Sequence, residues 1–305
     1  MADDLRARAS YLAYRAGAEV ARVLPDAVGE PAARVAGRVV SIAMPARRRL
    51  VARNLQRVSG GTLRGPALQR AVFETFDSYG RYWLELFRLP KDVRGPLDPG
   101  IHIDGFEHIE AGLAAGNGVI LALPHVGGWD YAGAWLAQRG HPPTVVVEPV
   151  EPPELFEWFA GAREALGMTV VQLGPDAGRA VLGALRDNRI VCLLSDRDLT
   201  GDGVEVEFFG ERTTLPGGPA TLALRTGAPL LPVAVYFEGR GGHHGVVQAP
   251  VPAERQGRLR EDVARVTQDM AHRFEELIAA APDQWHLLQP NWPSDTASLA
   301  GAGSA

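Results

Sequence analysis

The sequence predicts an α/β protein with a largely parallel central sheet covered by helices on both faces, preceded by an amino-terminal basic helical subdomain. From residue 101 onward, short apolar runs alternate with stretches of helical periodicity, a pattern typical of parallel sheets covered on both sides. Before residue 96, helical periodicity prevails and arginines are frequent. The 305 residues slightly exceed what one hydrophobic core accommodates. We therefore expect an α/β core over residues 96–293 and a smaller helical region over residues 1–95.

Four helices are expected in the amino-terminal region, each beginning or ending near a proline or a glycine-rich stretch. They cover residues 5–24, 32–44, a segment from Pro45 onward, and 66–87, followed by a linker over 89–100. The fourth helix carries aromatic residues at helical spacing, which need either a protein core or an acyl chain beside them. A protein core is the simpler explanation.

Charge is distributed unevenly along the chain. The net charge is −5, which gives no reason to expect nucleic-acid binding, but residues 1–60 contain eleven arginines and five acidic residues. This balance of +6 leaves −11 for the remainder. Basic helices with apolar residues are typical of a lipid interface, where Arg47, Arg48, Arg49 and Arg53 would face anionic lipid. An ordinary helical subdomain with a solvated basic face explains the pattern equally well.

Neither a signal peptide nor a membrane span is expected. Charged residues interrupt the first apolar stretch, and no apolar run reaches the roughly 18 residues that a transmembrane helix requires. Any contact with a membrane should therefore be peripheral.

In the α/β part, strands are expected where short apolar runs end at turn signals. They cover residues 101–103, 118–123, 144–147, 169–172, 190–195, 230–237 and 245–249. Helices cover residues 105–115, 131–139, 153–166, 178–188, 217–226 and 259–280. Residues 201–218 are expected to form a loop, and the Ala-, Gly- and Ser-rich residues 294–305 a disordered tail.

The stretch most suggestive of chemistry is residues 118–131, where an apolar strand delivers His125 to its carboxyl end. Ligands bind at this end of the strands in open α/β sheets. Asp130 follows, and a carboxylate that holds one ring nitrogen of His125 makes the other a general base. In a continuous helix the two side chains would lie about 140° apart, so the pair requires Gly127 and Gly128 to interrupt the helix. A lone histidine is usually structural, but this position favours catalysis.

Two further charged residues have a possible place at the site. Glu148 directly follows the apolar run 144–147, which puts it at the same rim as His125 unless it is a solvated loop acid. Arg163 lies in an expected helix and could offer a cation to a phosphate or to developing negative charge. A surface arginine is the alternative interpretation.

Asp196, Arg197 and Asp198 follow the strand expected over residues 190–195. Acids that flank an arginine can hold hydroxyl groups or fix a loop by ion pairing.

Cys192, the only cysteine, lies inside an apolar run and is expected to be part of the core and not a nucleophile. No histidine or cysteine spacing is typical of a zinc site, so no metal is expected.

Four blocks of sequence together carry a family resemblance. They read HVGGWD, SDRDLTGDGVEVEFFGE, TTLPGGPATLALRTGAPLLPVAVY and PDQWHLLQPNW. Over about residues 5–293 the chain resembles the bacterial lipid A biosynthesis acyltransferase superfamily, and within it the actinobacterial branch of phosphatidylinositol mannoside acyltransferases. The resemblance implies transfer of a fatty acyl group, typically palmitoyl, from the co-substrate acyl-CoA to the 6-hydroxyl of a mannose on phosphatidylinositol mannoside. It also implies a peripheral protein on the cytoplasmic face of the plasma membrane.

The resemblance also implies roles for particular residues. His125 would be the base and Asp130 its partner, with Glu148 and Arg163 lining the substrate site. The substrate-binding loop would carry Asp196, Arg197 and Asp198. No cofactor is implied, and a monomer is the default expectation.

Direct attack of the mannose hydroxyl on the thioester, with His125 as the base, also needs donors for the tetrahedral oxyanion and a tunnel for the acyl chain. The backbone amides of Val126, Gly127 and Gly128 are the candidate donors, because glycine permits close approach. The aromatic helix around residues 73–87 and the pair Phe208 and Phe209 are candidates for lining the tunnel.

The sequence departs from the wider families in two places. The Phe-Pro-Glu-Gly-Thr block of glycerolipid acyltransferases is replaced by FFGERTTLPGG, so a glycerol phosphate is not the expected acceptor. The amino-terminal membrane span that is usual in the lipid A branch has no counterpart here. Three other functions stay open: transfer to another glycolipid, hydrolysis of acyl esters or thioesters with the same pair, and a lipid-binding module in which His125 is structural.

Overall fold

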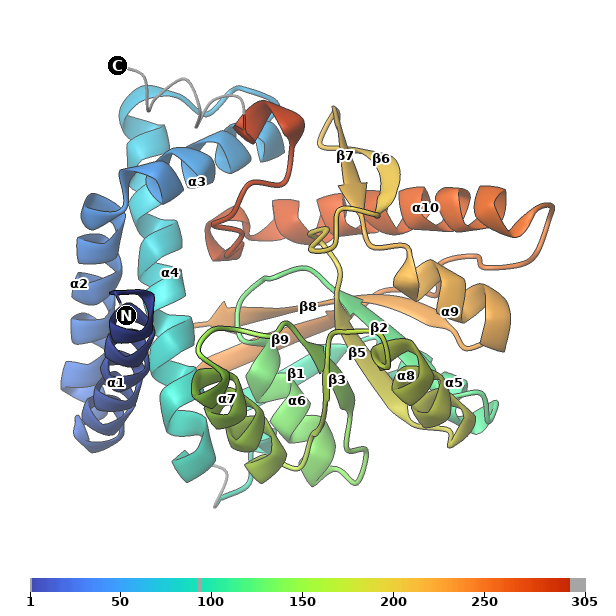
Figure 1. Cartoon of the computed structure of the whole chain (residues 1–305), viewed down its shortest axis with the longest axis horizontal. Helices are drawn as coiled ribbons and strands as arrows, with labels where there is room; N and C mark the ends of the chain where they lie inside the picture. The colour runs from blue at the N-terminus through green and yellow to red at the C-terminus, as the bar shows by residue number, and fades with distance from the viewer. Residues whose placement is uncertain (1, 93–94, 297–305) are drawn as a thin grey trace.

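The computed structural model describes residues 2–92 and 95–296, and a seven-stranded sheet forms its centre (Figure 1). The strand order is β1-β9-β8-β2-β5-β3-β4, and every neighbouring pair is parallel except β8 and β9. The largely parallel sheet is thus confirmed. The strands are β1 (Ile101–Asp104), β2 (Val119–Leu123), β3 (Thr144–Val147), β4 (Thr169–Gln172), β5 (Ile190–Leu194), β8 (Leu230–Glu238) and β9 (Gly242–Val247).

Helices cover both faces of the sheet, as the sequence predicted. On one face pack α5 (Phe106–Ala114) and α6 (Trp129–Gln138). On the other pack α8 (Ala177–Arg186), α9 (Gly218–Thr226) and α10 (Leu259–Ala280). Successive side chains of β2 alternate between these two cores: Ile120 and Ala122 join one, whereas Leu121 and Leu123 join the other.

The sheet is incomplete between β3 and β5. The two strands pair only at Thr144 with Val191 and at Val145 with Cys192. The last two residues of β3 pair with β4 alone. The helix α7 (Pro153–Ala165) follows β3 and lies near β4. The carboxyl ends of β3 and β5 therefore do not share a hydrogen-bonded ladder.

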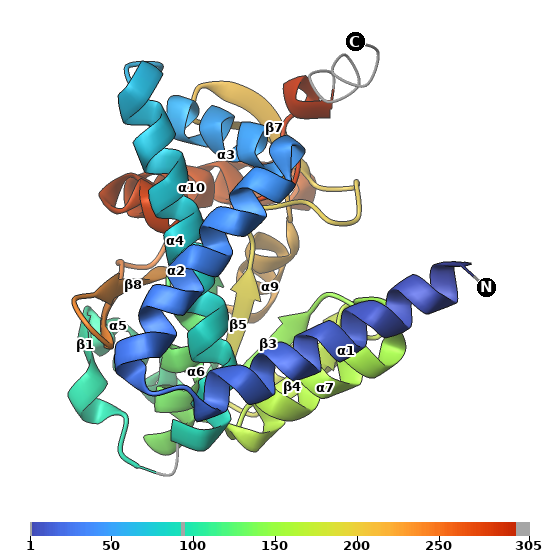
Figure 2. The same ribbon diagram turned by 90° about the vertical axis from the view of Figure 1, so that its left-hand side faces the viewer.

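The amino-terminal helices pack together beside the sheet, and α4 lies between α2 and the α/β core (Figures 1 and 2). They are α1 (Ala2–Val23), α2 (Asp26–Ala43), α3 (Pro45–Val58) and α4 (Gly65–Asp92). Where α2 crosses α4, a Cβ on Gly37 would lie 2.1 Å from the carbonyl oxygen of Phe76, and one on Gly80 would lie 2.3 Å from that of Ala33. Only glycine allows this approach.

Two boundaries in this region differ from the prediction. The second helix begins at Asp26 rather than after Pro31, so Pro31 lies inside it. The fourth continues to Asp92, so the first part of the expected linker is helical. Within the described residues, no helix combines the length and apolarity that crossing a bilayer requires.

The expected loop over residues 201–218 is instead largely an antiparallel hairpin of β6 (Val204–Phe208) and β7 (Glu211–Leu215). Two short 3₁₀ helices also occur in the described residues, η1 (Asp98–Gly100) and η2 (Pro282–Gln284).

The start of the expected disordered tail also differs from the prediction. Ser294 hydrogen-bonds to Arg53, and Asp295 is fully buried. Residues 297–305 lie outside the described part of the chain.

Candidate active site

His125 lies just beyond the carboxyl end of β2, where a tight turn leads into α6. β2 is buried along its whole length. Gly127 in the turn has φ of 62°, and a Cβ there would lie 2.0 Å from the carbonyl oxygen of Val235 on β8. Only glycine allows the turn to approach β8 so closely. The His125 side chain remains 25% exposed and lines a large cavity.

The carboxylate that binds His125 is that of Asp196. Its Oδ1 lies 2.5 Å from His125 Nδ1, and its Oδ2 accepts hydrogen bonds from the His125 backbone N–H (3.0 Å) and the Trp285 indole N–H (2.8 Å). Burial of Asp196 by itself raises its pKa, but the facing His125 and these hydrogen bonds hold the pKa below its ordinary value. With Nδ1 engaged, Nε2 is the ring nitrogen that remains for a substrate.

The prediction that Asp130 is the partner of His125 is therefore wrong. Asp130 receives two hydrogen bonds from Arg163, at 2.7 and 3.0 Å, and one from the Tyr82 hydroxyl at 3.0 Å. The expected break at the glycines does occur, since α6 begins at Trp129. The carboxylate of Asp130 nevertheless points toward α7 and α4, where a buried arginine binds it.

Sheet topology explains why Asp196 takes this place. β5 lies directly beside β2, and Leu123 pairs with Leu194. The Ser195 N–H continues the ladder to the Leu123 carbonyl at 2.9 Å. The residues just beyond the two strand ends, His125 and Asp196, are therefore neighbours. The sequence signal was present, because each follows a buried parallel strand, but the order of the strands was needed to pair them.

A cavity of about 670 Å³ adjoins this pair. Its wall is mostly apolar and includes residues from both faces of the sheet. On the α6 face it includes Leu121, Leu123, Leu136, Met168, Cys192, Leu194, Val233 and Val247. On the α8–α9 face it includes Val146, Val181, Leu193 and Leu222. A third part of the wall comes from α4, α6 and α7 and includes Tyr79, Tyr82, Trp83, Trp129 and Phe159.

Apart from Asp196, which is fully buried beside His125, the structure places the predicted substrate-binding residues around this cavity, with one exception. Glu148 and Arg197 both line it and form an ion pair with each other at 2.7 Å. Arg163 lines it as well, although its guanidinium is bound to Asp130, which raises the pKa of Arg163 against the effect of burial. Asp198 is the exception, since it lines a separate pocket.

Asp198 stabilises the loop after β5. Its carboxylate accepts hydrogen bonds from the backbone N–H groups of Gly201 (2.9 Å) and Gly203 (2.9 Å) and from the Thr214 hydroxyl (2.9 Å). These donors keep the pKa of Asp198 below its ordinary value although burial raises it. Of the two roles considered for this acid, the structure corresponds to fixing the loop.

The three backbone amides predicted to receive the oxyanion already have partners. Val126 N–H donates to Pro124 O at 2.8 Å, Gly127 N–H to Gln284 O at 3.0 Å, and Gly128 N–H to Val235 O at 2.9 Å. Glycine permitted close approach, as expected, but the group that approaches is the protein's own backbone. The prediction of these oxyanion donors is therefore wrong.

A second histidine, which the sequence did not single out, lies beside His125. His286 is 5% exposed, lines the cavity, and its Nε2 is 2.9 Å from the Ser78 hydroxyl. Its Nδ1 is buried with no hydrogen-bond partner. Burial, and then the neighbouring His125, lower the pKa of His286 to about 3, so its ring is neutral at physiological pH.

The structure also revises what surrounds the cavity. Phe208 and Phe209 do not line it; Phe208 is fully buried against Trp292. Only the second half of the aromatic helix contributes to the wall. Cys192 lines the cavity and is half-buried, and its removal from bulk water raises the pKa of its thiol to about 12. Among residues 2–92 and 95–296, no three metal-binding side chains cluster.

Known proteins resemble this chain over most of its length. The family model for bacterial lipid A biosynthesis acyltransferase matches residues 4–294. A phosphatidylinositol mannoside acyltransferase of Mycobacterium tuberculosis (strain ATCC 25618 / H37Rv) is 48% identical over 226 residues, 72% of this chain and 70% of the relative. One of Mycolicibacterium smegmatis is 40% identical over 289 residues, 93% of this chain and 91% of the relative. A lipid A biosynthesis acyltransferase of Haemophilus influenzae is 29% identical over 188 residues, 59% of this chain and 55% of the relative.

Proposed function

The chain belongs to the bacterial lipid A biosynthesis acyltransferase family, and we propose that it transfers a palmitoyl group from palmitoyl-CoA to the 6-hydroxyl of a mannose on phosphatidylinositol mannoside. The acceptor is that named for the mycobacterial relatives. The observation that carries the proposal is His125, bound by the buried Asp196, on the wall of a large apolar cavity. An acceptor hydroxyl beside His125 Nε2 can lose its proton to this base. A fatty acyl chain bound in the cavity is shielded from water by the apolar wall.

In the proposed reaction, His125 Nε2 takes the proton of the mannose hydroxyl as its oxygen attacks the thioester carbonyl carbon. The new C–O bond forms, and the C–S bond then breaks. The protonated ring returns the proton to the CoA thiolate, so the base is regenerated. Asp196 stabilises the imidazolium and fixes its orientation. Positioned base catalysis of this kind contributes roughly 10²–10⁴-fold to the rate.

The transient oxyanion needs a hydrogen-bond donor other than the amides after His125. We propose His286 for this role, because its Nδ1 is without a partner and its ring lines the same cavity. If Ser78 donates its hydroxyl proton to Nε2, the neutral ring carries its own proton on Nδ1. A neutral donor held by the protein stabilises developing negative charge without first being reorganised.

We propose that the face formed by α1 and α2 contacts the membrane that contains the acceptor. Large apolar side chains are exposed along both helices. They are Leu12, Val20, Val23, Val28, Val35, Val39 and Ile42, each between 51% and 67% exposed except Val23 at 77%. Large apolar side chains exposed along consecutive helices are typical of helices that lie at a membrane interface.

The arginines of α3 fit this contact less well than the sequence suggested. Arg48 hydrogen-bonds to Gln69 at 2.6 Å, and Arg53 binds the buried Asp295 at 3.0 Å. We therefore expect apolar burial rather than arginine charge to dominate binding. Vesicle sedimentation tests this: Val35→Asp with Val39→Asp should reduce the bound fraction, whereas Ala111→Asp, which adds charge on the distant α5, should not. Equal binding of the wild type, the double variant and Ala111→Asp would reject the α1–α2 face as the membrane contact.

One assay tests the enzymatic proposal. Purified protein is incubated with palmitoyl-CoA and a panel of phosphatidylinositol mannosides and lipid A precursors, and products are identified by mass. A mono-palmitoylated mannoside is the expected product, and His125→Ala should abolish it. Acylation of a lipid A precursor but of no mannoside would mean that the acceptor is a lipid A precursor and not phosphatidylinositol mannoside. CoA release without any acylated lipid would favour a hydrolase, and full activity of His125→Ala would reject the base assignment.

A further inference from the structure

The carboxyl-terminal segment, defined here as residues 282–296, runs directly along the His125–Asp196 pair. Its backbone meets the turn after β2 in two places. The Gly127 N–H donates to Gln284 O at 3.0 Å, and the His286 N–H donates to His125 O at 2.7 Å. The segment is therefore part of the scaffold that fixes His125, although 160 positions separate it from that residue in sequence.

Two side chains of this segment reach Asp196 itself. The Trp285 indole N–H donates to Oδ2 at 2.8 Å, and the Asn291 amide N–H donates to the Asp196 backbone carbonyl at 3.0 Å. Trp285 is 3% exposed and packs against Phe209 and Trp292. Because Oδ1 binds His125 while Oδ2 binds a rigidly packed indole, the plane of the carboxylate is set from both ends.

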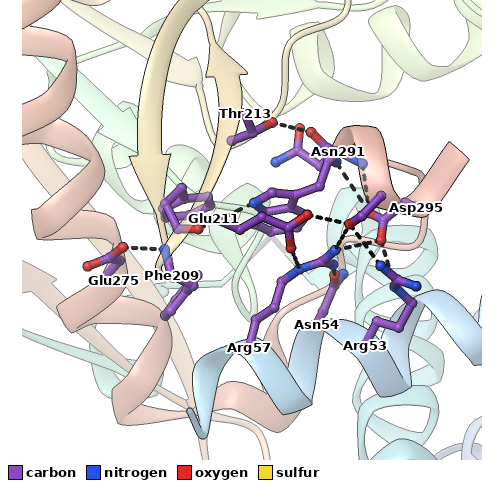
Figure 3. A network of polar contacts seen from close by, with 12 residues as sticks. Arg53, Asn54, Arg57, Phe209, Glu211, Thr213, Glu275, Asn291 and Asp295 are labelled. Atoms are coloured by element: carbon purple, nitrogen blue, oxygen red, sulfur yellow. Dashed lines mark hydrogen bonds and ion pairs between the residues drawn. The ribbon is translucent and has the colours of Figure 1, made fainter. Parts of the chain in front are cut away.

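The far end of the segment is anchored to α3 and to the β6–β7 hairpin (Figure 3). The fully buried Asp295 carboxylate accepts hydrogen bonds from Arg57 at 2.8 Å and from the Asn291 backbone N–H at 3.2 Å. Arg57 also binds Glu211 on β7 at 2.9 Å. These contacts leave Asn291, and the loop that leads back to Trp285, little freedom to move.

We propose that Trp285 is a positioning residue, which holds the Asp196 carboxylate in the orientation that binds His125. It acts through Asp196 and does not touch the reacting atoms. The proposal rests on the proposed function only for the consequence that a misplaced carboxylate slows transfer. The geometric part applies to the protein at rest and can be measured without substrate.

The test replaces Trp285 with phenylalanine, which keeps an aromatic ring and removes the N–H. Trp292→Phe is the matched control, because its indole N–H donates to the Phe208 carbonyl at 3.3 Å and not to Asp196. The short His125–Asp196 hydrogen bond should give a strongly deshielded proton in the NMR spectrum of the resting protein. We expect Trp285→Phe to lose or broaden this resonance, and Trp292→Phe to retain it.

The pH profile of acyl transfer gives a second readout. Loss of a donor to Oδ2 leaves more negative charge on the Asp196 oxygen that faces the imidazolium of His125, which favours the protonated base, so the acid limb of kcat/KM should move to higher pH by roughly one unit. The plateau value of kcat should fall about tenfold. Other titratable groups near the pair should not interfere, because His286 stays neutral and Asp130 is bound to Arg163.

The outcomes separate the two proposals. If the wild-type protein shows the deshielded proton but transfers no acyl group, the proposed function fails while the role of Trp285 can still be judged by NMR. If Trp285→Phe matches Trp292→Phe in both spectrum and pH profile, the positioning role is rejected. Should Trp285→Phe not fold, replacement of Trp285 by β-(3-benzothienyl)alanine keeps the bicyclic ring and removes the N–H that donates to Oδ2, and an unchanged resonance in that variant also overturns the proposal.

Discussion

Asp130 and Asp196 are two buried carboxylates near one cavity, and their partners make them different. Asp130 binds Arg163 and Tyr82, which ties α6 to α7 and α4. Asp196 binds His125 and Trp285 at the carboxyl ends of two adjacent strands. Arginine keeps its proton at any physiological pH, whereas histidine gains and loses one. The first pair can only hold elements together, but the second can take part in proton transfer.

The difference shows that a carboxylate only five positions after a catalytic histidine in the sequence can have a structural role. A short sequence distance did not bring Asp130 to His125, because the start of α6 directs its carboxylate to a buried guanidinium. Sheet pairing brought Asp196 there from 71 positions away. Neutralising Asp196 should therefore reduce catalysis, whereas neutralising Asp130 should reduce the stability of the fold.

The largest expected effect is that of Asp196→Asn on acyl transfer. An amide cannot stabilise the imidazolium and favours the wrong tautomer of His125, so kcat should fall about 10³–10⁴-fold. Steady-state kinetics on palmitoyl-CoA and the mannoside acceptor measure this. A decrease in kcat of less than tenfold would mean that Asp196 does not serve His125.

Asp130→Asn should act mainly on stability. The substitution leaves the 13% exposed Arg163 side chain without its counter-charge, and breaking a buried ion pair in this way costs about 3–5 kcal/mol. Urea unfolding measures the loss. The deshielded proton of the His125–Asp196 pair should persist in the folded variant, and its disappearance would show that the two acids are not independent.

His286 sharpens the comparison, because this imidazole lies beside His125 but has no carboxylate partner. Its folded pKa of about 3 lies below the ordinary value of 6.5. The unfolded chain therefore takes up a proton first as pH falls, and the stability due to the neutral ring declines from pH 6.5 toward pH 3. Urea unfolding at pH 6.5 and 5.0 should differ by roughly 1.5–2 kcal/mol from this group alone. His286→Gln should remove that part of the difference; an identical pH dependence in the variant would contradict the assignment.

The smallest expected effect is that of Tyr82→Phe. This substitution removes one of three hydrogen bonds to Asp130 and leaves both bonds from Arg163 in place. A hydrogen bond to a charged group contributes about 1.5–3 kcal/mol, and the remaining partners should keep the loss near the lower value. Thermal unfolding of Tyr82→Phe beside Asp130→Asn provides the measurement. A loss as large as that of Asp130→Asn would mean that Tyr82, not Arg163, is the principal partner.

Much of the fold could be predicted from the sequence because short apolar runs and amphipathic helices carry a local signal. The apolar runs that form β3 and β4 were located to the residue, and α10 was as well. The hairpin β6–β7 was missed although Val204 to Phe208 alternates apolar and acidic residues as a half-buried strand does. Its turn is Phe209-Gly210, with φ of 51° and 71°. Phe209 stands where asparagine, aspartate or glycine is usual, so the turn signal was weak.

The candidate site was predictable only in part, because its contacts are not local. His125 was identified from its place after a buried strand. Its carboxylate partner depended on the order of strands in the sheet, and Trp285 and His286 depended on how the carboxyl-terminal segment returns to the turn. The amides of Gly127 and Gly128 were misjudged for the same reason, since their acceptors come from β8 and from η2. The sequence indicates where the chain can turn, but it does not indicate which distant group will hydrogen-bond to that turn.

The short pairing between β3 and β5 affects the space that the acyl donor of the proposed reaction could occupy. Because the ladder stops at Val145 and Cys192, the sheet has a slot at its carboxyl edge, and the cavity adjoins side chains on both sides of that slot. The cavity therefore reaches from one layer of helices to the other at this edge of the sheet, which leaves space for a long, thin molecule. The reactive carbonyl of such a molecule would sit in the opening, which is where a neighbouring strand end presents its imidazole.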